Sequence, residues 1–242
     1  MIKQFDLQKR YQECRQNMSN YFLEYYFKEK ISQIEKEGRF KMFNNPTLMN
    51  KWGEADSNYF EKSRDIVSKG YIYNESEEEK RRKKEIEHIN LYCGYSDTVI
   101  NNWLRDNSAF CFDKSIKDSL DNIINSSIIK DDIIVVRRIY QALKVKDKKV
   151  GDVLVDKAFL STSLNINYRL NYQSEEVKLN NEALCIIKIP KGTNGVYIQN
   201  ALEEGKRRDE YEILFNREAQ LEIEYKKRIF NNYLLVLKMI KN

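Results

Sequence analysis

The stretch Asp-Glu-Tyr-Glu-Ile-Leu-Phe, residues 209–215, combines two acids with an apolar pattern typical of a β-strand. Side chains alternate between the two faces of a strand, so we expect Glu210 and Glu212 to point to one side, with their carboxylates roughly 7 Å apart. The opposite face is apolar and consists of Tyr211, Ile213 and Phe215. Two acids on a strand face are most simply a solvated surface, but they can also divide the work of stabilising a cation and activating a nucleophile.

The rest of the sequence places helices before strands. Apolar side chains at helical spacing predict helices over about Phe5–Lys36, Ser57–Lys69, Asp97–Asp106 and Lys114–Ile124. Short β-branched and aromatic runs between turns predict strands over Ile133–Ile139, Lys157–Ser163, Ala183–Ile189, Gly195–Ile198, Leu221–Tyr225 and Tyr233–Ile240. We expect Gly94 to end a helix and Ser96 to cap the next one. Helices followed by strands with short links indicate an α+β fold with mostly antiparallel pairing.

A turn signal at Asn44-Asn45-Pro46 divides the chain. Residues 1–44 are expected to form a helical extension, and residues 45–242 the main domain. Aromatic and aliphatic side chains recur at spacings of three, four and seven along the extension, which predicts that this helix docks on the main body. A surface for a partner is the alternative interpretation of the same stripe.

The composition argues against several classes of protein. Among 242 residues, 42 Lys and Arg stand against 37 Asp and Glu with both signs interspersed, so the net charge of +5 does not form the basic face of a nucleic-acid binder. Four cysteines without short metal spacing and a single histidine, His88, argue against a metal centre and a histidine-based triad. No apolar run is long enough to span a membrane, and Met1–Asp6 lacks the apolar segment of a secretory signal. We therefore expect no metal, no nucleic-acid partner and no stable membrane insertion.

Three strand-borne elements stand in a specific order. Arg137 follows the β-branched run of the first strand, the Ser-Thr-Ser run at 161–163 ends the second, and Glu210-x-Glu212 lies on the strand near the C-terminus. Each element alone is common on protein surfaces. In this order the combination resembles the Arg-Ser-Glu class of mono-ADP-ribosyltransferases, in particular the bacterial exoenzymes that include actin-modifying binary toxins and Rho-modifying enzymes.

The resemblance covers the chain from about Trp52 to the C-terminus. Trp52-Gly53 is similar to the opening motif of the group. Two further similar segments are Tyr92 through Asn101-Asn102-Trp103-Leu104-Arg105, and Ile189-Pro190-Lys191-Gly192-Thr193 with Val196-Tyr197-Ile198. The resemblance implies a β core of two sheets, of the ADP-ribosyltransferase type, behind the N-terminal helices.

The resemblance implies NAD as co-substrate, without a metal. A pyrophosphate favours a planar, permanently charged donor, which Arg137 supplies, and Arg138 is expected to add to it or to hold the loop. The resemblance further implies that Ser161 hydrogen-bonds near the nicotinamide ribose and positions the acid, while Thr162 and Ser163 shape the turn. The remaining cofactor-binding residues that it implies are Tyr92, Asn101, Tyr172 and Glu212.

The two acids carry the chemistry in this interpretation. Breaking the bond between nicotinamide and ribose develops an oxocarbenium-like cation, which the carboxylate of Glu212 is expected to stabilise. An arginine side chain is a poor nucleophile until a base acts on it, and the resemblance implies that Glu at position 210 accompanies arginine targets, whereas Gln accompanies asparagine targets. The expected catalytic residues are therefore Glu212, Glu210 and Ser161. Those expected to recognise the substrate are Glu210, Arg208 and Tyr197.

The resemblance also implies a biological role. The protein is expected to be a toxin or effector component, secreted or delivered to a host cytosol, that modifies a host protein such as actin, with a translocation component as a further partner. Features that depart from the group include Val136, which replaces the usual aromatic before the first arginine, and the loop after the Ser-Thr-Ser turn, where no arginine stands at the expected place after Tyr172. Either Tyr168-Arg169 or Tyr172 could supply the ring that stacks on the nicotinamide. A plain NAD glycohydrolase and a catalytically inactive binding module are the alternative functions.

Overall fold

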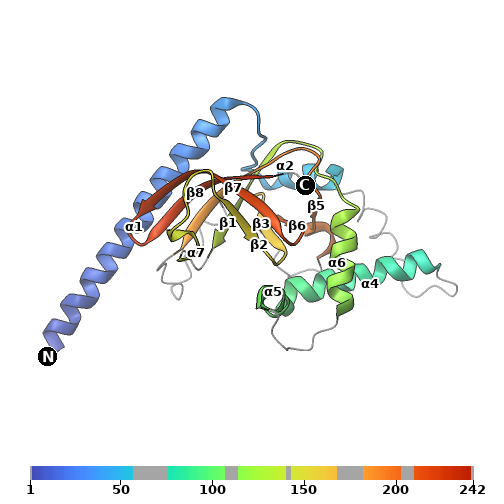
Figure 1. The fold of residues 1–242 in the computed structure, drawn as a ribbon, viewed down its shortest axis with the longest axis horizontal. Helices are drawn as coiled ribbons and strands as arrows, with labels where there is room; N and C mark the ends of the chain where they lie inside the picture. Colours follow the sequence, from blue (N-terminus) through green and yellow to red (C-terminus); the bar gives the residue numbers. More distant parts are fainter. Residues whose placement is uncertain are drawn as a thin grey trace.

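The computed structural model describes residues 2–56, 76–106, 114–139, 143–167, 182–202 and 210–240 (Figure 1). The expected helix over Ser57–Lys69 lies outside these residues, as do the nicotinamide-loop candidates Tyr168, Arg169 and Tyr172 and the substrate-recognition candidate Arg208. Within the described ranges, no helix is both long enough and apolar enough to cross a membrane.

Helices dominate the described residues in the first half of the chain. Their bounds are α1 Ile2–Glu37, α2 Pro46–Asp56, α4 Glu77–Leu91, α5 Asp97–Asp106 and α6 Lys114–Asn125, with a short α7, Leu143–Lys146, after the first strand. α1 ends at Gly38, whose φ of +65° suits glycine and whose amide donates to the Glu35 carbonyl at 3.0 Å. Pro46 opens α2 directly after Asn45, whose side-chain oxygen accepts from the Thr47 amide at 2.8 Å.

α4 and α5 form one continuous helical path. Ser76 caps α4 by accepting from the Glu79 amide at 3.3 Å, and the Glu79 carboxylate accepts from the Ser76 amide at 2.9 Å. At its other end α4 passes into a single π-helical turn, Tyr92–Ser96, which leads directly into α5. The expectation that Gly94 ends a helix and Ser96 caps the next one is wrong, because helical backbone continues through both residues. The first two residues of this turn are buried.

Within the described residues, the second half of the chain forms one eight-stranded sheet. The strands are β1 Ile133–Ile139, β2 Val153–Asp156, β3 Leu160–Ser163, β4 Ala183–Ile189, β5 Gly195–Tyr197, β6 Glu212–Phe215, β7 Ala219–Ile229 and β8 Asn232–Met239. Their spatial order is β2-β7-β8-β4-β1-β3-β6-β5, and β4 with β8 is a parallel pair in an otherwise antiparallel arrangement. The expected α+β fold with mostly antiparallel pairing is confirmed.

The expectation of two sheets is not confirmed, because the described strands are hydrogen-bonded in one continuous order. β1 joins β3 through a single registered pair, Val136 opposite Ser163, whereas β1 and β4 are registered over their whole length. We call this junction the β1–β3 seam. It divides the sheet into a long limb, β2-β7-β8-β4-β1, and a short limb, β3-β6-β5.

Buried apolar side chains join the sheet to the helices in three clusters of described residues. The largest contains side chains of both limbs, among them Val135 and Leu235 from the long limb and Leu160 and Phe215 from the short limb. The second packs α4, α5 and α6 on the short limb, and the third packs α1 on the long limb through residues such as Phe27. In Figure 1, α1 runs along one side of the sheet, while α4, α5 and α6 gather at the other end of the molecule.

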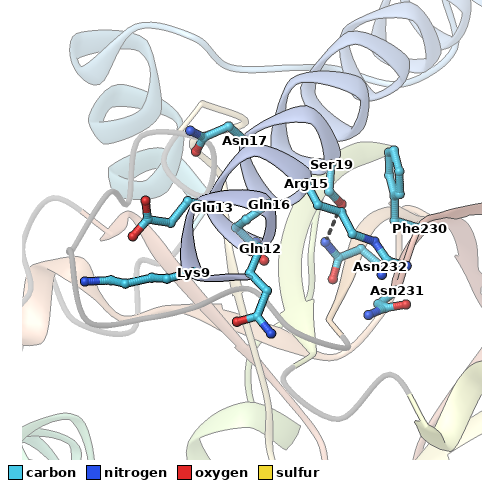
Figure 2. Close-up of a pocket in the computed structure, with 10 residues that line it drawn as sticks. All are labelled: Lys9, Gln12, Glu13, Arg15, Gln16, Asn17, Ser19, Phe230, Asn231 and Asn232. Atoms are coloured by element: carbon cyan, nitrogen blue, oxygen red, sulfur yellow. Dashed lines mark hydrogen bonds between the residues drawn. The ribbon is translucent and has the colours of Figure 1, made fainter. Parts of the chain in front are cut away.

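The N-terminal part of α1 meets the turn between β7 and β8, where the two elements border a hollow lined mainly by polar side chains (Figure 2). The Ser19 hydroxyl donates to the Ile229 carbonyl at 3.5 Å, and the Asn232 amide donates to the Ser19 oxygen at 2.9 Å. Phe230 has a φ of +54°, which is uncommon for an aromatic residue, and its ring centre lies 6.4 Å from that of Phe22. Polar and aromatic contacts therefore seat α1 on this hairpin.

Candidate active site

The three signature elements lie on neighbouring strands. β3 stands between β1 and β6, so Arg137, residues 161–163 and Glu212 come from three consecutive strands (Figure 1). Ser163 lies opposite Val136 of β1 and opposite Glu212 of β6. The candidates are therefore gathered around the β1–β3 seam.

Arg137 bridges the seam with its guanidinium group. Its Nη1 donates to the Ser161 carbonyl at 3.1 Å, and its Nη2 donates to the Asp156 carboxylate at 3.2 Å. Burial lowers the pKa of Arg137, and the charge of Asp156 opposes this effect. The group stays charged at neutral pH because the ordinary pKa of arginine lies far above neutrality. A planar, charged donor is thereby fixed beside the backbone of Ser161.

Arg138 lies on the other face of β1. It is buried and forms an ion pair with Glu182, with 2.9 Å between Nε and Oε2. Successive side chains of a strand point to opposite faces, so Arg138 shares the face of Val136, which packs in the cluster beneath α1. Of the two roles expected for Arg138, this placement argues against adding its charge beside Arg137. Its ion pair instead anchors the residue that precedes β4.

Asp156, at the end of β2, is a site residue that the sequence did not reveal. Its carboxylate accepts two hydrogen bonds of 2.9 Å from Nε and Nη2 of Arg105 in α5, in addition to the bond from Arg137. Burial alone would raise the pKa of Asp156, but the hydrogen bonds from Arg105 and the charges of both arginines outweigh it and hold that pKa below its ordinary value. One ionised carboxylate thus joins arginines from two separate elements.

Glu212 opens β6 as a buried carboxylate with 4% of its surface exposed. The Cys93 thiol lies 3.8 Å from its Oε2, within range of a weak hydrogen bond. Burial raises the pKa of Tyr92; the charge of Glu212 adds to this effect and the charge of Arg137 opposes it, so the Tyr92 hydroxyl lies within reach of both charges. Asn101 donates to this hydroxyl at 2.9 Å. The π-helical turn and α5 thereby bring two expected cofactor-binding residues to the acid of β6.

The backbone turns sharply between the two acids. β6 begins at Glu212, and Tyr211 has a φ of +47°, so the strand is shorter than the expected 209–215. The expectation that alternation places Glu210 and Glu212 on one strand face is wrong, because Glu210 belongs to the turn that precedes the strand. The expected apolar face is confirmed: Ile213 and Phe215 lie in the largest cluster, and Tyr211 packs against it.

The Ser-Thr-Ser run fixes the backbone on both sides of Glu212. The Ser163 hydroxyl donates to the Glu210 carbonyl at 2.5 Å. The Thr162 hydroxyl donates to the Ile213 carbonyl at 3.0 Å. Both hydroxyls therefore hold the path of the chain at the acids, and the Ser161 carbonyl holds Arg137.

Tyr197 does not lie at a surface open to a protein substrate. Its side chain is fully buried, its ring faces Gly53 of α2, and its hydroxyl donates to the Asn50 side chain at 2.9 Å. The expectation that Tyr197 recognises the substrate is therefore wrong. The residue instead packs α2 against β5, where a glycine allows the close approach of helix and ring.

Comparison with known proteins finds a match to a protein family. The family model described as ADP-ribosyltransferase exoenzyme matches residues 49–239. No curated protein matches the sequence. Within the described residues, no group of three or more His, Cys, Asp and Glu side chains is arranged to hold a metal ion.

Solved structures of bacterial toxins share the fold. Plx2a, an ADP-ribosyltransferase toxin from Paenibacillus larvae, has a TM-score of 0.58 and 19% sequence identity over 84% of this chain and 100% of its own. The C3 exoenzyme of Clostridium limosum has a TM-score of 0.58 and 16% identity over 84% of this chain and 98% of its own. BECa, an ADP-ribosylating toxin of a binary enterotoxin of C. perfringens solved with NADH, has a TM-score of 0.59 and 20% identity over 84% of this chain but 50% of its own. The resemblance found in the sequence is thus confirmed, and the chain belongs to the ADP-ribosyltransferase exoenzyme family, in which NAD is the co-substrate.

Proposed function

We propose that this protein is an NAD-dependent mono-ADP-ribosyltransferase that modifies an arginine side chain of a protein. The observation that carries the proposal is the arrangement of Arg137, Ser161 and Glu212 on three consecutive strands, with Arg137 bonded to the Ser161 carbonyl at 3.1 Å. The charges of Arg137 and Glu212 both act on the Tyr92 hydroxyl, which supports one shared site. Opposite charges in one site suit a dinucleotide whose pyrophosphate is anionic and whose ribose becomes cationic in the transition state.

The chemistry follows from the arginines at one end of this site and the Glu212 carboxylate at the other. Arg137 and Arg105 hold the pyrophosphate, and the bond between the ribose C1′ and the nicotinamide nitrogen then breaks with its electron pair leaving on nicotinamide. Positive charge develops on the ribose, and the Glu212 carboxylate stabilises it in surroundings that exclude water, where a charge acts more strongly than in bulk solvent. Ser161 orients the ribose and this acid. The acceptor nitrogen then attacks C1′ and transfers its proton to Glu210.

Arginine is the proposed acceptor because the residue two positions before Glu212 is Glu210 rather than a glutamine. An acceptor guanidinium needs a carboxylate to draw off a proton, which an amide cannot do. One structure of the same fold, the ADP-ribosyltransferase Vis, was solved with agmatine, which carries the guanidinium group of arginine (TM-score 0.50, 20% identity over 73% of this chain). A host protein such as actin is the proposed target, reached after delivery to the host cytosol with a translocation component as partner.

The proposal is tested by incubating the protein with biotinylated NAD and eukaryotic or bacterial lysates, followed by mass spectrometry of the labelled residue. We expect labelled arginine with the wild type, NAD cleavage without transfer for Glu210→Gln, and neither for Glu212→Gln. The matched control is Glu24→Gln, which changes an exposed acid of α1 and should label like the wild type. Labelling of asparagine, cysteine or threonine would overturn the arginine assignment, and transfer that survives Glu212→Gln would overturn the mechanism.

The same assay separates the alternative functions. Release of nicotinamide with no labelled protein in any lysate identifies a plain NAD glycohydrolase. A protein that neither cleaves NAD nor gains thermal stability from it is a catalytically inactive binding module. Labelling confined to bacterial proteins replaces the host target with a bacterial one.

A further inference from the structure

Asp156 joins three elements at the site. It ends β2, holds Arg105 of α5 through both carboxylate oxygens at 2.9 Å, and holds Arg137 of β1 through Oδ2 at 3.2 Å. Its Oδ1 also accepts from the Ala158 amide at 3.1 Å, which ties the carboxylate to the segment leading into β3. Three partners therefore fix the position of the Asp156 side chain. The same hydrogen bonds fix the distance between the guanidinium groups of Arg105 and Arg137.

The two arginines need such a group because their charges repel. Burial lowers the pKa of Arg137, the charge of Asp156 raises it and the charge of Arg105 lowers it, so the three charges act on one another. Their side chains are 16–26% exposed, and at that depth water screens the repulsion only in part. With Asp156 ionised, the cluster keeps a single net positive charge and both guanidinium groups hold one geometry.

The cluster also retains capacity for an anion. Arg137 has five N–H donors, and within the described part of the chain its bonds to Asp156 and Ser161 use two of them. A pyrophosphate requires donors at a fixed spacing, because a donor displaced by even about 1 Å loses much of its contribution. Asp156 itself is an anion and would repel the pyrophosphate, so any benefit that it gives must come from placing the arginines.

We propose that Asp156 is a positioning residue for NAD, whose carboxylate holds Arg105 and Arg137 at the spacing that the pyrophosphate requires. This inference rests on the proposed use of NAD by this site. The Asp156 carboxylate has two opposite effects on the binding of NAD. Its negative charge alone weakens binding, whereas its hydrogen bonds to the two arginines strengthen binding. A role limited to fastening α5 to the sheet would leave the affinity for NAD unchanged.

The chain contains a matched control for this proposal. Asp121 of α6 accepts two hydrogen bonds from Arg217, at 2.9 and 2.8 Å, and a third from Lys117 at 2.9 Å. Its side chain is 21% exposed, against 22% for Asp156. Asp121→Asn therefore breaks an ion pair of the same geometry and burial that lies outside the proposed site.

The experiment measures the dissociation constants of NAD and ADP-ribose, the KM and kcat of NAD cleavage, and the melting temperature of each variant. We expect Asp156→Asn to weaken both ligands about tenfold to a hundredfold, as hydrogen bonds to charged groups predict, and to raise KM with little change in kcat, because the pyrophosphate is gripped equally in ground and transition states. Asp156→Glu, which keeps the charge, should restore part of the affinity even if Asp156→Asn folds poorly. Asp121→Asn should lower the melting temperature and leave both dissociation constants unchanged.

Wild-type affinity in Asp156→Asn, or equal weakening in Asp121→Asn, would overturn the inference. An increase in affinity in Asp156→Asn would also overturn it, because the charge of Asp156 would then outweigh its positioning effect. These results differ from failure of the proposed function, in which the wild-type protein itself would bind neither NAD nor ADP-ribose.

Discussion

Gly53→Ala tests the close packing of α2 on the sheet beside the site. A methyl group at this position would lie 2.1, 2.2 and 2.6 Å from three ring carbons of Tyr197, well inside the 3.4–4 Å of an ordinary contact. The ring cannot move outward, because Tyr197 is fully buried and its hydroxyl is bonded to Asn50. Either the helix or the strand must shift to admit one extra carbon.

The cost follows from two opposing effects. Overpacking a well-filled core destabilises by about 1–3 kcal/mol, and an overlap with a fixed ring belongs at the upper end of that range. Alanine is better than glycine in a helix by about 1 kcal/mol, which offsets part of the overlap. The net expectation is a loss of about 2 kcal/mol in the free energy of unfolding, which for a chain of this size lowers the melting temperature by about 4–8 °C.

Thermal and urea unfolding followed by circular dichroism measure this loss, with Gly94→Ala as the control. A methyl group at Gly94 meets nothing within 4 Å, and the backbone there is helical, so this variant should be as stable as the wild type or slightly more stable. Replacing Tyr197 by leucine in the Gly53→Ala background should recover part of the loss, since the two residues then no longer collide. A Gly53→Ala protein that melts at or above the Gly94→Ala control would refute the reasoning.

Three further predictions concern the charged groups. Glu212→Gln should lower the rate of NAD cleavage by about a hundredfold to a thousandfold with the fold intact by circular dichroism, and cleavage within tenfold of wild type would contradict its assigned role. Arg138→Met should lower the free energy of unfolding by about 3–5 kcal/mol, because Glu182 is left buried without its partner; adding Glu182→Leu should recover most of that loss in urea titrations. Asp156 has a lowered pKa in the folded state, so its stabilising effect is present above its ordinary pKa of about 3.9 and is lost as the pH falls through the folded value. The stability advantage of wild type over Asp156→Asn should therefore shrink between about pH 5 and pH 2, and an advantage that stays constant over this range would contradict the pairing.

Local sequence patterns were enough to predict the elements that form because of their own short runs of residues. The strands Ile133–Ile139 and Ala183–Ile189 match their expected bounds, because both are short, β-branched and buried on both faces. The short apolar runs around Arg137, Ser161 and Glu212 also predicted that each of these residues lies on a strand of its own, as it does. Each of these inferences used residues adjacent in sequence, where strand geometry and burial act directly.

The features that the sequence did not predict depend on contacts between distant residues. β2 has only four residues and, among the described strands, pairs only with β7, and its exposed valines carry little of the burial signal that marks a strand. Asp156 becomes a site residue only because folding brings Arg105 and Arg137 to it from other elements. The left-handed backbone of Tyr211 overrides strand alternation, since the Ser163 hydroxyl and the Leu164 amide fix the carbonyls on either side of that turn.

The β1–β3 seam has a consequence for the motions of the enzyme. Strands that share one registered pair separate at a lower free-energy cost than strands that are paired along their length. Amide protons at the seam should therefore exchange with deuterium sooner than those of β4 and β8. A dinucleotide gripped by Arg137 from one limb and by residues near Ser161 from the other would act as a removable crosslink between the limbs. Without a ligand, the strands at the catalytic centre would then separate more easily than the rest of the described sheet, and binding of the dinucleotide would stabilise their pairing more than that of any other part.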